Sequence, residues 1–248
     1  MSKTIDIAVV GATGLVGGAV LERLAQTELN IGHLYPLASE ESDGSVVEFG
    51  KRHLTVHSLE RFDFSKVQIA ILCVPAAVVE AILPRISKQD CWLIDHSTAL
   101  RQRHDVPLVV ATVNPADIAQ ARDNRFIACP DSGVSMLSPL VHLLNEYSQV
   151  QRVNVVMLRA VSDIGKIGID ELSKQSIALF NLKPMVREQF KQQIAFNVIP
   201  QYANPTEQAY DLEQQIEMEL RKISNSPELK VNAMLAHVPV FYGHSLSV

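Results

Sequence analysis

The sequence predicts an α/β protein whose N-terminal part is a doubly wound, mostly parallel sheet. Two observations indicate this fold. A β-branched apolar run at residues 5–10 leads directly into a glycine turn at 11–17 and then into a helical apolar pattern. Short apolar runs then alternate with helical patterns up to about residue 131, where the texture of the sequence changes. We therefore expect two domains, residues 1–131 and 132–248.

The elements of the first domain follow in order. The helix after the glycine turn has apolar residues at spacings of three and four, from Val16 to Leu24. Asn114 and Pro115 predict a helix start, with Asn as the N-cap and Pro at the first helical position. The remaining expected elements are strands at 33–38, 67–74, 92–95 and 126–129, a polar loop at 39–50 and a helix at 76–86.

A strand that ends in a glycine-rich turn before a helix is the unit that binds a dinucleotide pyrophosphate in Rossmann-type folds. Glycines let the backbone approach the phosphates, and the helix start presents unbonded N–H groups. A tight turn without a ligand is the alternative. The residues predicted to bind the cofactor here are Gly11, Thr13, Gly14, Leu15, Val16 and Gly17.

The second domain is expected to contain a strand at 153–161, a helix at 168–182, an amphipathic helix at 206–223 and a strand at 235–241. Glu217 and Arg221 are spaced to form an ion pair on the polar side of the amphipathic helix. Its apolar face consists of Leu212, Ile216, Leu220 and Ile223.

The composition excludes several classes of protein. Lys+Arg 22 against Asp+Glu 27 gives a net charge of -5, which argues against nucleic acid or an anionic membrane as a partner. The most apolar stretch, residues 67–83, is interrupted by Pro75 and polar residues, so no membrane span is expected. Three scattered cysteines predict neither a disulfide framework nor a metal site. They favour a reducing, cytoplasmic compartment.

Four ordered segments carry a family resemblance: the glycine turn, residues 94–101, residues 129–132 and residues 237–245. Together they resemble the aspartate-semialdehyde dehydrogenase family over essentially the whole chain. The resemblance implies a nicotinamide-binding Rossmann domain, an α+β catalytic and dimerisation domain, and a homodimer. It also implies NAD or NADP as cofactor and a small anionic metabolite as substrate. In that family a cysteine thiolate attacks an aldehyde, hydride passes to the nicotinamide, and phosphate releases an acyl phosphate.

The catalytic positions that this resemblance implies are largely altered. The family's cysteine nucleophile corresponds to Ser132, its glutamine to Arg159 and its carboxylate-binding arginine to His237. Only the histidine base is kept, as His244. A serine hydroxyl is a weak nucleophile at neutral pH unless a base activates it. We therefore expect negligible dehydrogenase activity.

The anion and cofactor positions are also partly changed. Arg101 matches the family's phosphate-binding arginine, and Glu213 matches the glutamate of a Glu-x-Lys pair whose lysine is missing. In the loop that begins at Ser39, the family's arginine for the 2′-phosphate of NADP is replaced by Glu41. A carboxylate repels a phosphate and accepts hydrogen bonds from a ribose diol, so NAD should be favoured over NADP.

These changes resemble the Usg-type paralogues of the family, which lack the catalytic cysteine. The leading interpretation is a catalytically degenerate protein with a binding or regulatory role. The alternative is an active NAD(P)-dependent oxidoreductase of amino-acid biosynthesis with unusual residues. Two lesser alternatives are that Cys129 is a substitute nucleophile and that Ser132 and His244 belong to a hydrolase triad.

Two further expectations concern geometry. Arg159 and Arg101 should converge near Ser132, with the Arg159 guanidinium free to bind a carboxylate or phosphate. The alternative is that Arg159 pairs with Asp163 or Glu213. Because chains of the family continue well beyond Ser245, we also expect an incomplete second domain in which the segment 235–248 lacks strand partners.

Overall fold

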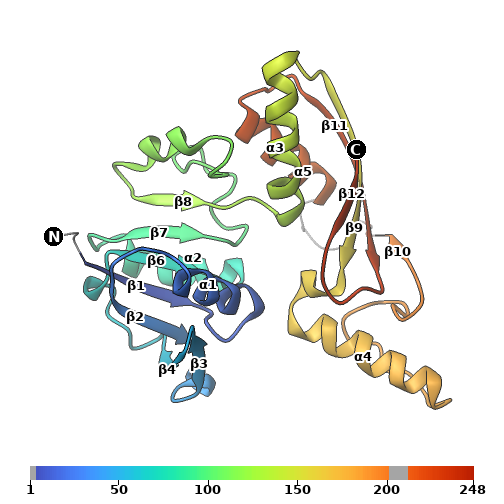
Figure 1. Ribbon diagram of the computed structural model, residues 1–248, viewed down its shortest axis with the longest axis horizontal. Helices are drawn as coiled ribbons and strands as arrows, with labels where there is room; N and C mark the ends of the chain where they lie inside the picture. The colour runs from blue at the N-terminus through green and yellow to red at the C-terminus, as the bar shows by residue number, and fades with distance from the viewer. Residues whose placement is uncertain (1–3, 201–211) are drawn as a thin grey trace. The chain divides into compact units, whose positions relative to one another are not determined.

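The computed structural model describes residues 4–200 and 212–248. Its contacts divide the chain into two compact units, Met1–Pro130 and Asp131–Val248. Figure 1 shows the elements of each unit. Within the described ranges, no helix is long and apolar enough to cross a membrane.

The first unit is built on a six-stranded parallel sheet with the order β5-β2-β1-β6-β7-β8. From β1 the chain adds β2 on one side, and later it adds β6 and β7 on the other side. Because parallel crossovers are right-handed, α1 (Leu15–Ala25) and α2 (Ala76–Ile86) therefore cover opposite faces of the sheet. The predicted doubly wound sheet is confirmed. Its strands are β1 (Ile5–Val10), β2 (Ile31–Ala38), β5 (His57–Ser58), β6 (Ile69–Leu72), β7 (Trp92–Asp95) and β8 (Phe126–Ala128).

The core of this unit explains the sequence of β1. Ala8, Val9 and Val10 are all 0% exposed, because helices cover both faces of the sheet. Leu21 of α1 packs in one cluster with Ile7 and Val9. This burial fixes the end of β1, and therefore the glycine turn, against a rigid sheet.

The prediction of a polar loop at residues 39–50 was wrong. It contains a short 3-10 helix, η1 (Glu40–Ser42), and a strand, β3 (Val46–Phe49), that pairs antiparallel with β4 (Arg52–Thr55). Gly50 makes the hairpin turn at a φ of 59°. A second 3-10 helix, η2 (Phe64–Lys66), follows β5.

Asn114 is the N-cap residue of the helix that follows it, as predicted, but its side chain makes no capping hydrogen bond. The helix is a 3-10 helix, η3 (Pro115–Ala121), and Pro115 occupies its first position as predicted. The Asn114 side chain instead accepts a hydrogen bond from the Val110 N–H (2.8 Å) and donates one to the Leu108 carbonyl (2.9 Å). Its amide therefore stabilises the preceding loop.

The second unit contains a four-stranded mixed sheet with the order β10-β11-β9-β12. Figure 1 shows α3 and α5 packed on one face of this sheet and α4 beyond its end. Helix α3 was not predicted. The strands are β9 (Arg152–Ala160), β10 (Ile199–Pro200), β11 (Lys230–Val238) and β12 (Ser245–Ser247), and the helices are α3 (Ser132–Tyr147), η4 (Val161–Ile164), α4 (Lys166–Phe180) and α5 (Leu212–Ser224).

Helix α5 bears out the predicted amphipathic pattern. Ile216 and Leu220 are fully buried, and Glu217 pairs with Arg221 at 2.7 Å. The first part of the predicted helix, residues 206–211, lies outside the described residues.

The predictions for the C-terminal segment were partly wrong. β11 runs from Lys230 and pairs with β9 along its whole length and with β10 on its other side, so this strand does not lack partners. It ends before Pro239, which has no N–H to donate. β12 is an edge strand on β9. Two apolar side chains of the central strands remain exposed: Leu158 on β9 is 36% exposed, and Met234 on the neighbouring β11 is 53% exposed.

Candidate functional site

The glycine turn joins β1 to α1 at the carboxyl edge of the parallel sheet. Gly11 has a φ of 81°, and its N–H donates to the Leu37 carbonyl at 2.8 Å. Gly14 is the N-cap of α1. The ends of β1 and β2 are therefore adjacent at the place where a dinucleotide binds in sheets of this type.

Close backbone approach explains why glycines occur in this turn. A Cβ on Gly11 would lie 2.3 Å from the Cys73 carbonyl oxygen, and one on Gly17 would lie 2.1 Å from the Gly11 carbonyl oxygen. Within the described residues, the N–H groups of Leu15, Val16 and Gly17 make no backbone hydrogen bond. These groups and the positive end of the α1 dipole fit a pyrophosphate.

The predicted ribose-binding residues follow β2. Ser39 is the N-cap of η1, and Glu41 lies in its first turn with an exposed side chain. Leu37, which accepts the hydrogen bond from the glycine turn, lies two residues before Ser39. Ser39 and Glu41 are thus at the same carboxyl edge as the turn. Their roles in binding remain predictions.

Arg101 and Cys129 also belong to the first unit. Arg101 is buried, and its guanidinium donates to the His96 carbonyl at 3.0 Å. Ser132 belongs to the second unit, so the convergence of Arg101 on Ser132 remains a prediction.

The Cys129 thiol does not have the properties of an activated nucleophile. Burial raises its pKa to about 11, aided by the charge of Asp95 and opposed by Arg101. Its Sγ lies 3.8 Å from His96 Nε2, and burial lowers the pKa of His96. A protonated thiol beside a neutral imidazole disfavours Cys129 as a substitute nucleophile.

Ser132 is the first residue of α3 and is exposed. The preceding residue, Asp131, caps the helix by accepting a hydrogen bond from the Gly133 N–H at 2.8 Å. In the described part of the chain, no residue forms a hydrogen bond with the Ser132 hydroxyl. No base is therefore in place to activate it.

Arg159 is buried and bonded to two carboxylates. It is 5% exposed; its Nη2 lies 3.0 Å from Asp131 Oδ2 and also contacts Asp163 Oδ1. Burial would lower its pKa, but the two carboxylates outweigh that effect and raise it. The prediction of a guanidinium free for an anion was wrong. Asp163 was the anticipated alternative partner, whereas Asp131 was not anticipated.

His237 extends this cluster. It is 7% exposed, and its Nε2 lies 3.3 Å from Asp163 Oδ2. Burial would raise the pKa of Asp163, but the His237 hydrogen bond and Arg159 lower it to about 2. Asp163 therefore binds both Arg159 and His237.

The cluster continues to a buried acid on α5. Glu219 is 0% exposed and accepts a hydrogen bond from the Asp131 N–H at 2.6 Å. Gln215 donates to its other oxygen, also at 2.6 Å. Sequence reasoning missed Glu219 because the helix was interpreted as having a solvated acidic face. Its spacing of three from Ile216 and four from Ile223 was the available signal. Glu213, on the same helix, is half-buried, and its role remains a prediction.

His244, the predicted counterpart of the family's histidine base, is fixed in an unfavourable tautomer for a base. Its Nδ1 accepts a hydrogen bond from the Ala160 backbone N–H at 3.0 Å. A backbone N–H can only donate, so Nδ1 is unprotonated and the neutral ring carries its proton on Nε2. Burial lowers the pKa of His244, which favours this neutral form. Neither ring nitrogen then accepts a further proton.

Among the described residues, no group of three or more His, Cys, Asp and Glu side chains is arranged to hold a metal ion.

The parallel sheet with its glycine turn and the mixed α+β unit define a two-domain nucleotide-binding protein.

The chain belongs to the semialdehyde dehydrogenase family. The model of the family's NAD binding domain matches residues 6–121, and that of its dimerisation domain matches residues 137–248. Aspartate-semialdehyde dehydrogenase 2 of Vibrio cholerae is 38% identical over 100% of this chain and 74% of its own length. A USG-1 protein homolog of Azotobacter vinelandii is 34% identical over the same shares. The crystal structure of Vibrio cholerae aspartate semialdehyde dehydrogenase II complexed with ASA matches with a TM-score of 0.94 and 36% identity, over 99% of this chain and 73% of that chain.

Proposed function

We propose that this protein is a catalytically degenerate member of its family, similar to the Usg-type paralogues, that keeps a nucleotide-binding unit for a binding or regulatory role. The single observation that carries the proposal is the pairing of Arg159 with Asp131 and Asp163. The cation of the altered site is neutralised within the protein, so a substrate carboxylate would have to displace two buried acids.

The nucleophile and base positions support the same proposal. Phosphate-dependent aldehyde oxidation needs a nucleophile that also leaves readily and a base that accepts its proton. Ser132 supplies neither thiolate chemistry nor a hydrogen bond to a base, and His244 is committed to the Ala160 N–H. Each defect lowers the rate on its own, and restoring one leaves the other.

The cofactor proposal rests on the first unit. The residues that would hold a dinucleotide are the glycine turn, whose N–H groups face the pyrophosphate, and Ser39 and Glu41 for the ribose. When bound, the nicotinamide would supply hydride chemistry. We expect NAD to bind more tightly than NADP, because Glu41 repels a 2′-phosphate. The small anionic metabolite would contact Arg101, and the cytoplasm remains the proposed compartment.

The exposed apolar side chains of the second unit support a homodimer. Leu158 and Met234 lie on adjacent strands of the sheet, and the matched family model is a dimerisation domain. Covering such a face is how an obligate dimer removes apolar area from water.

The test combines calorimetry with an assay on one preparation. We expect NAD binding, NADP binding weaker by a factor on the order of 30, equivalent to about 2 kcal/mol, and no turnover approaching roughly 1 s⁻¹ with aspartate semialdehyde, phosphate and either nucleotide. Glu41→Arg should reverse the preference, and Glu48→Arg, on the exposed hairpin, should not. Turnover at ordinary enzyme rates would establish the competing oxidoreductase instead.

A further inference from the structure

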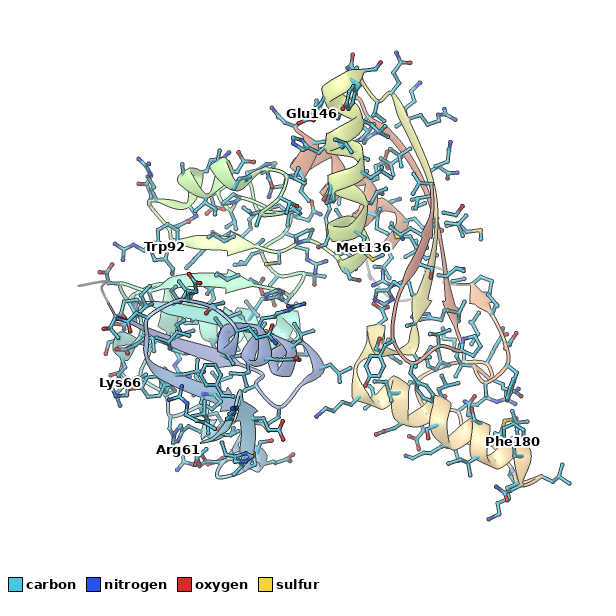
Figure 2. The ribbon with its side chains drawn as sticks, viewed as in Figure 1. Arg61, Lys66, Trp92, Met136, Glu146 and Phe180 are labelled. Carbon is cyan, nitrogen blue, oxygen red and sulfur yellow. The ribbon has the colours of Figure 1, made fainter. Side chains whose placement is uncertain are left out.

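A pocket of about 320 Å³ lies at the β2–β5 margin of the first unit, away from the glycine turn. Figure 2 labels Arg61 and Lys66, two of its lining residues. This volume is at the lower end of the range for small-molecule sites. None of the residues assigned to the cofactor or to catalysis lines it, so the pocket needs its own explanation.

The inner wall of the pocket is aromatic. The rings of Tyr35 and Phe62 lie 5.2 Å apart between centroids and are tilted by 54°. Phe62 is held from behind by Phe64, whose ring meets it edge-on at 5.2 Å. Two half-buried rings fixed in this way provide a preformed surface for a flat apolar group.

An unsatisfied hydroxyl lies in the same wall. Ser58 is 4% exposed and lines the pocket, and its Oγ has no hydrogen-bond partner in the described part of the chain. A buried hydroxyl without a partner costs free energy in an isolated protein. A ligand with a polar group at this depth would remove that cost.

The rim carries both signs of charge in equal number. Arg61 pairs with Asp43 at 2.9 Å and with Glu40, which does not line the pocket, at 3.3 Å. Asp63 and Lys66 remain, three residues apart at η2. Asp63 Oδ1 accepts a hydrogen bond from the Ser65 N–H (3.0 Å), and both Asp63 and Lys66 are exposed to solvent. An exposed carboxylate and ammonium at one mouth match a ligand that also carries both charges.

We propose that this pocket binds a zwitterionic amino acid with an aromatic side chain. The ring lies against Tyr35 and Phe62, the α-carboxylate faces Lys66, and the α-ammonium faces Asp63. An aromatic acid without the amine leaves Asp63 unmatched, and an aromatic amine without the carboxylate leaves Lys66 unmatched. The proposal is independent of the degenerate catalytic site, because it concerns different residues of the first unit.

Calorimetric titration with three probes tests this: L-phenylalanine, 3-phenylpropionate and phenethylamine. Phenylalanine should bind saturably with a Kd on the order of 1 mM or tighter, and each of the other two should bind roughly tenfold more weakly. Lys66→Ala should weaken the binding of phenylalanine by about the same factor and leave the affinity for phenethylamine unchanged. Lys51→Ala, on the hairpin outside the pocket, is the matched control.

Ser58→Ala separates a binding role from a structural one. Because the hydroxyl is unsatisfied, its removal should leave the thermal midpoint unchanged or higher. It should weaken the binding of L-tyrosine, whose phenol hydroxyl can reach Ser58, more than that of L-phenylalanine, which has no polar group at that depth. The proposal is overturned if phenylalanine does not saturate by about 10 mM, if the three probes bind equally, or if Lys66→Ala and Lys51→Ala behave alike. Displacement of phenylalanine by NAD would assign the pocket to the cofactor and overturn it as well.

Discussion

The glycine turn of the first unit leaves N–H groups unbonded at a helix start, whereas the charged side chains of the second unit are bonded to one another. In the first case Gly11 and Gly17 allow the backbone of the turn to pack closely against Cys73 and against itself. In the second, Asp131 and Asp163 pair with the Arg159 guanidinium, which is therefore not available to another anion. The comparison shows that a family fold can keep one binding surface open while its charged site is satisfied internally.

The largest expected effect comes from breaking the buried cluster. Arg159→Met leaves Asp131 and Asp163 without their cation and should lower the free energy of unfolding by about 3–5 kcal/mol. Arg152→Met, at an exposed position on the same strand, should change it by no more than about 0.5 kcal/mol. Urea denaturation of both variants measures the difference. Equal losses would show that Arg159 does not hold the unit together.

The corresponding test in the first unit concerns the space available for a side chain at the start of α1. A Cβ on Gly17 would meet the Gly11 carbonyl oxygen, so Gly17→Ala should cost on the order of 3 kcal/mol and weaken NAD binding. A Cβ on Gly18 would meet no atom within 4 Å, and Gly18→Ala should stabilise α1 by about 0.5–1 kcal/mol. If both variants lose nucleotide binding equally, close approach at residue 17 is not the cause.

The smallest expected effect is a pH dependence of the second unit. The pKa of Asp163 is about 2 in the folded chain, below the unfolded value of about 3.9. The contribution of Asp163 to the free energy of unfolding is therefore present above about pH 4. It is lost as the pH falls toward 2, by about 2 kcal/mol in total. Asp163→Asn should remove this part of the acid destabilisation between pH 5 and 2.5. Asp170→Asn, an exposed control on α4, should keep it, and identical pH profiles for both variants would contradict the assignment.

Local pattern was enough to predict the nucleotide half. β1 and α1 follow from a β-branched run and a helical period, and burial on both faces of the sheet agrees with that pattern. The hairpin from Val46 to Thr55 was missed because each strand is only four residues long and the first of them lies between Gly44 and Gly50. Helix α3 was missed because Ser132 was considered as a site residue and not as a position following an Asp N-cap.

The charge cluster could not be predicted as a whole. Arg159 and Asp163 are one helical turn apart in sequence, so their pairing was foreseeable. Asp131 and Glu219 are distant in the sequence, and only the packing of α3, α5 and β9 brings them together. The sequence singled out Arg159 and His237 as candidates, but only three-dimensional contacts show which groups they bind.

The central claim is that the second unit lacks more than a cysteine. Its most direct test is the turnover of Ser132→Cys with aspartate semialdehyde, phosphate and NAD or NADP. Nucleotide binding by the same sample shows that the first unit is folded. We predict a rate well below roughly 1 s⁻¹, because Arg159 stays paired with Asp131 and Asp163 and His244 stays bonded to the Ala160 N–H. A rate at or above that value from this single substitution would contradict the account.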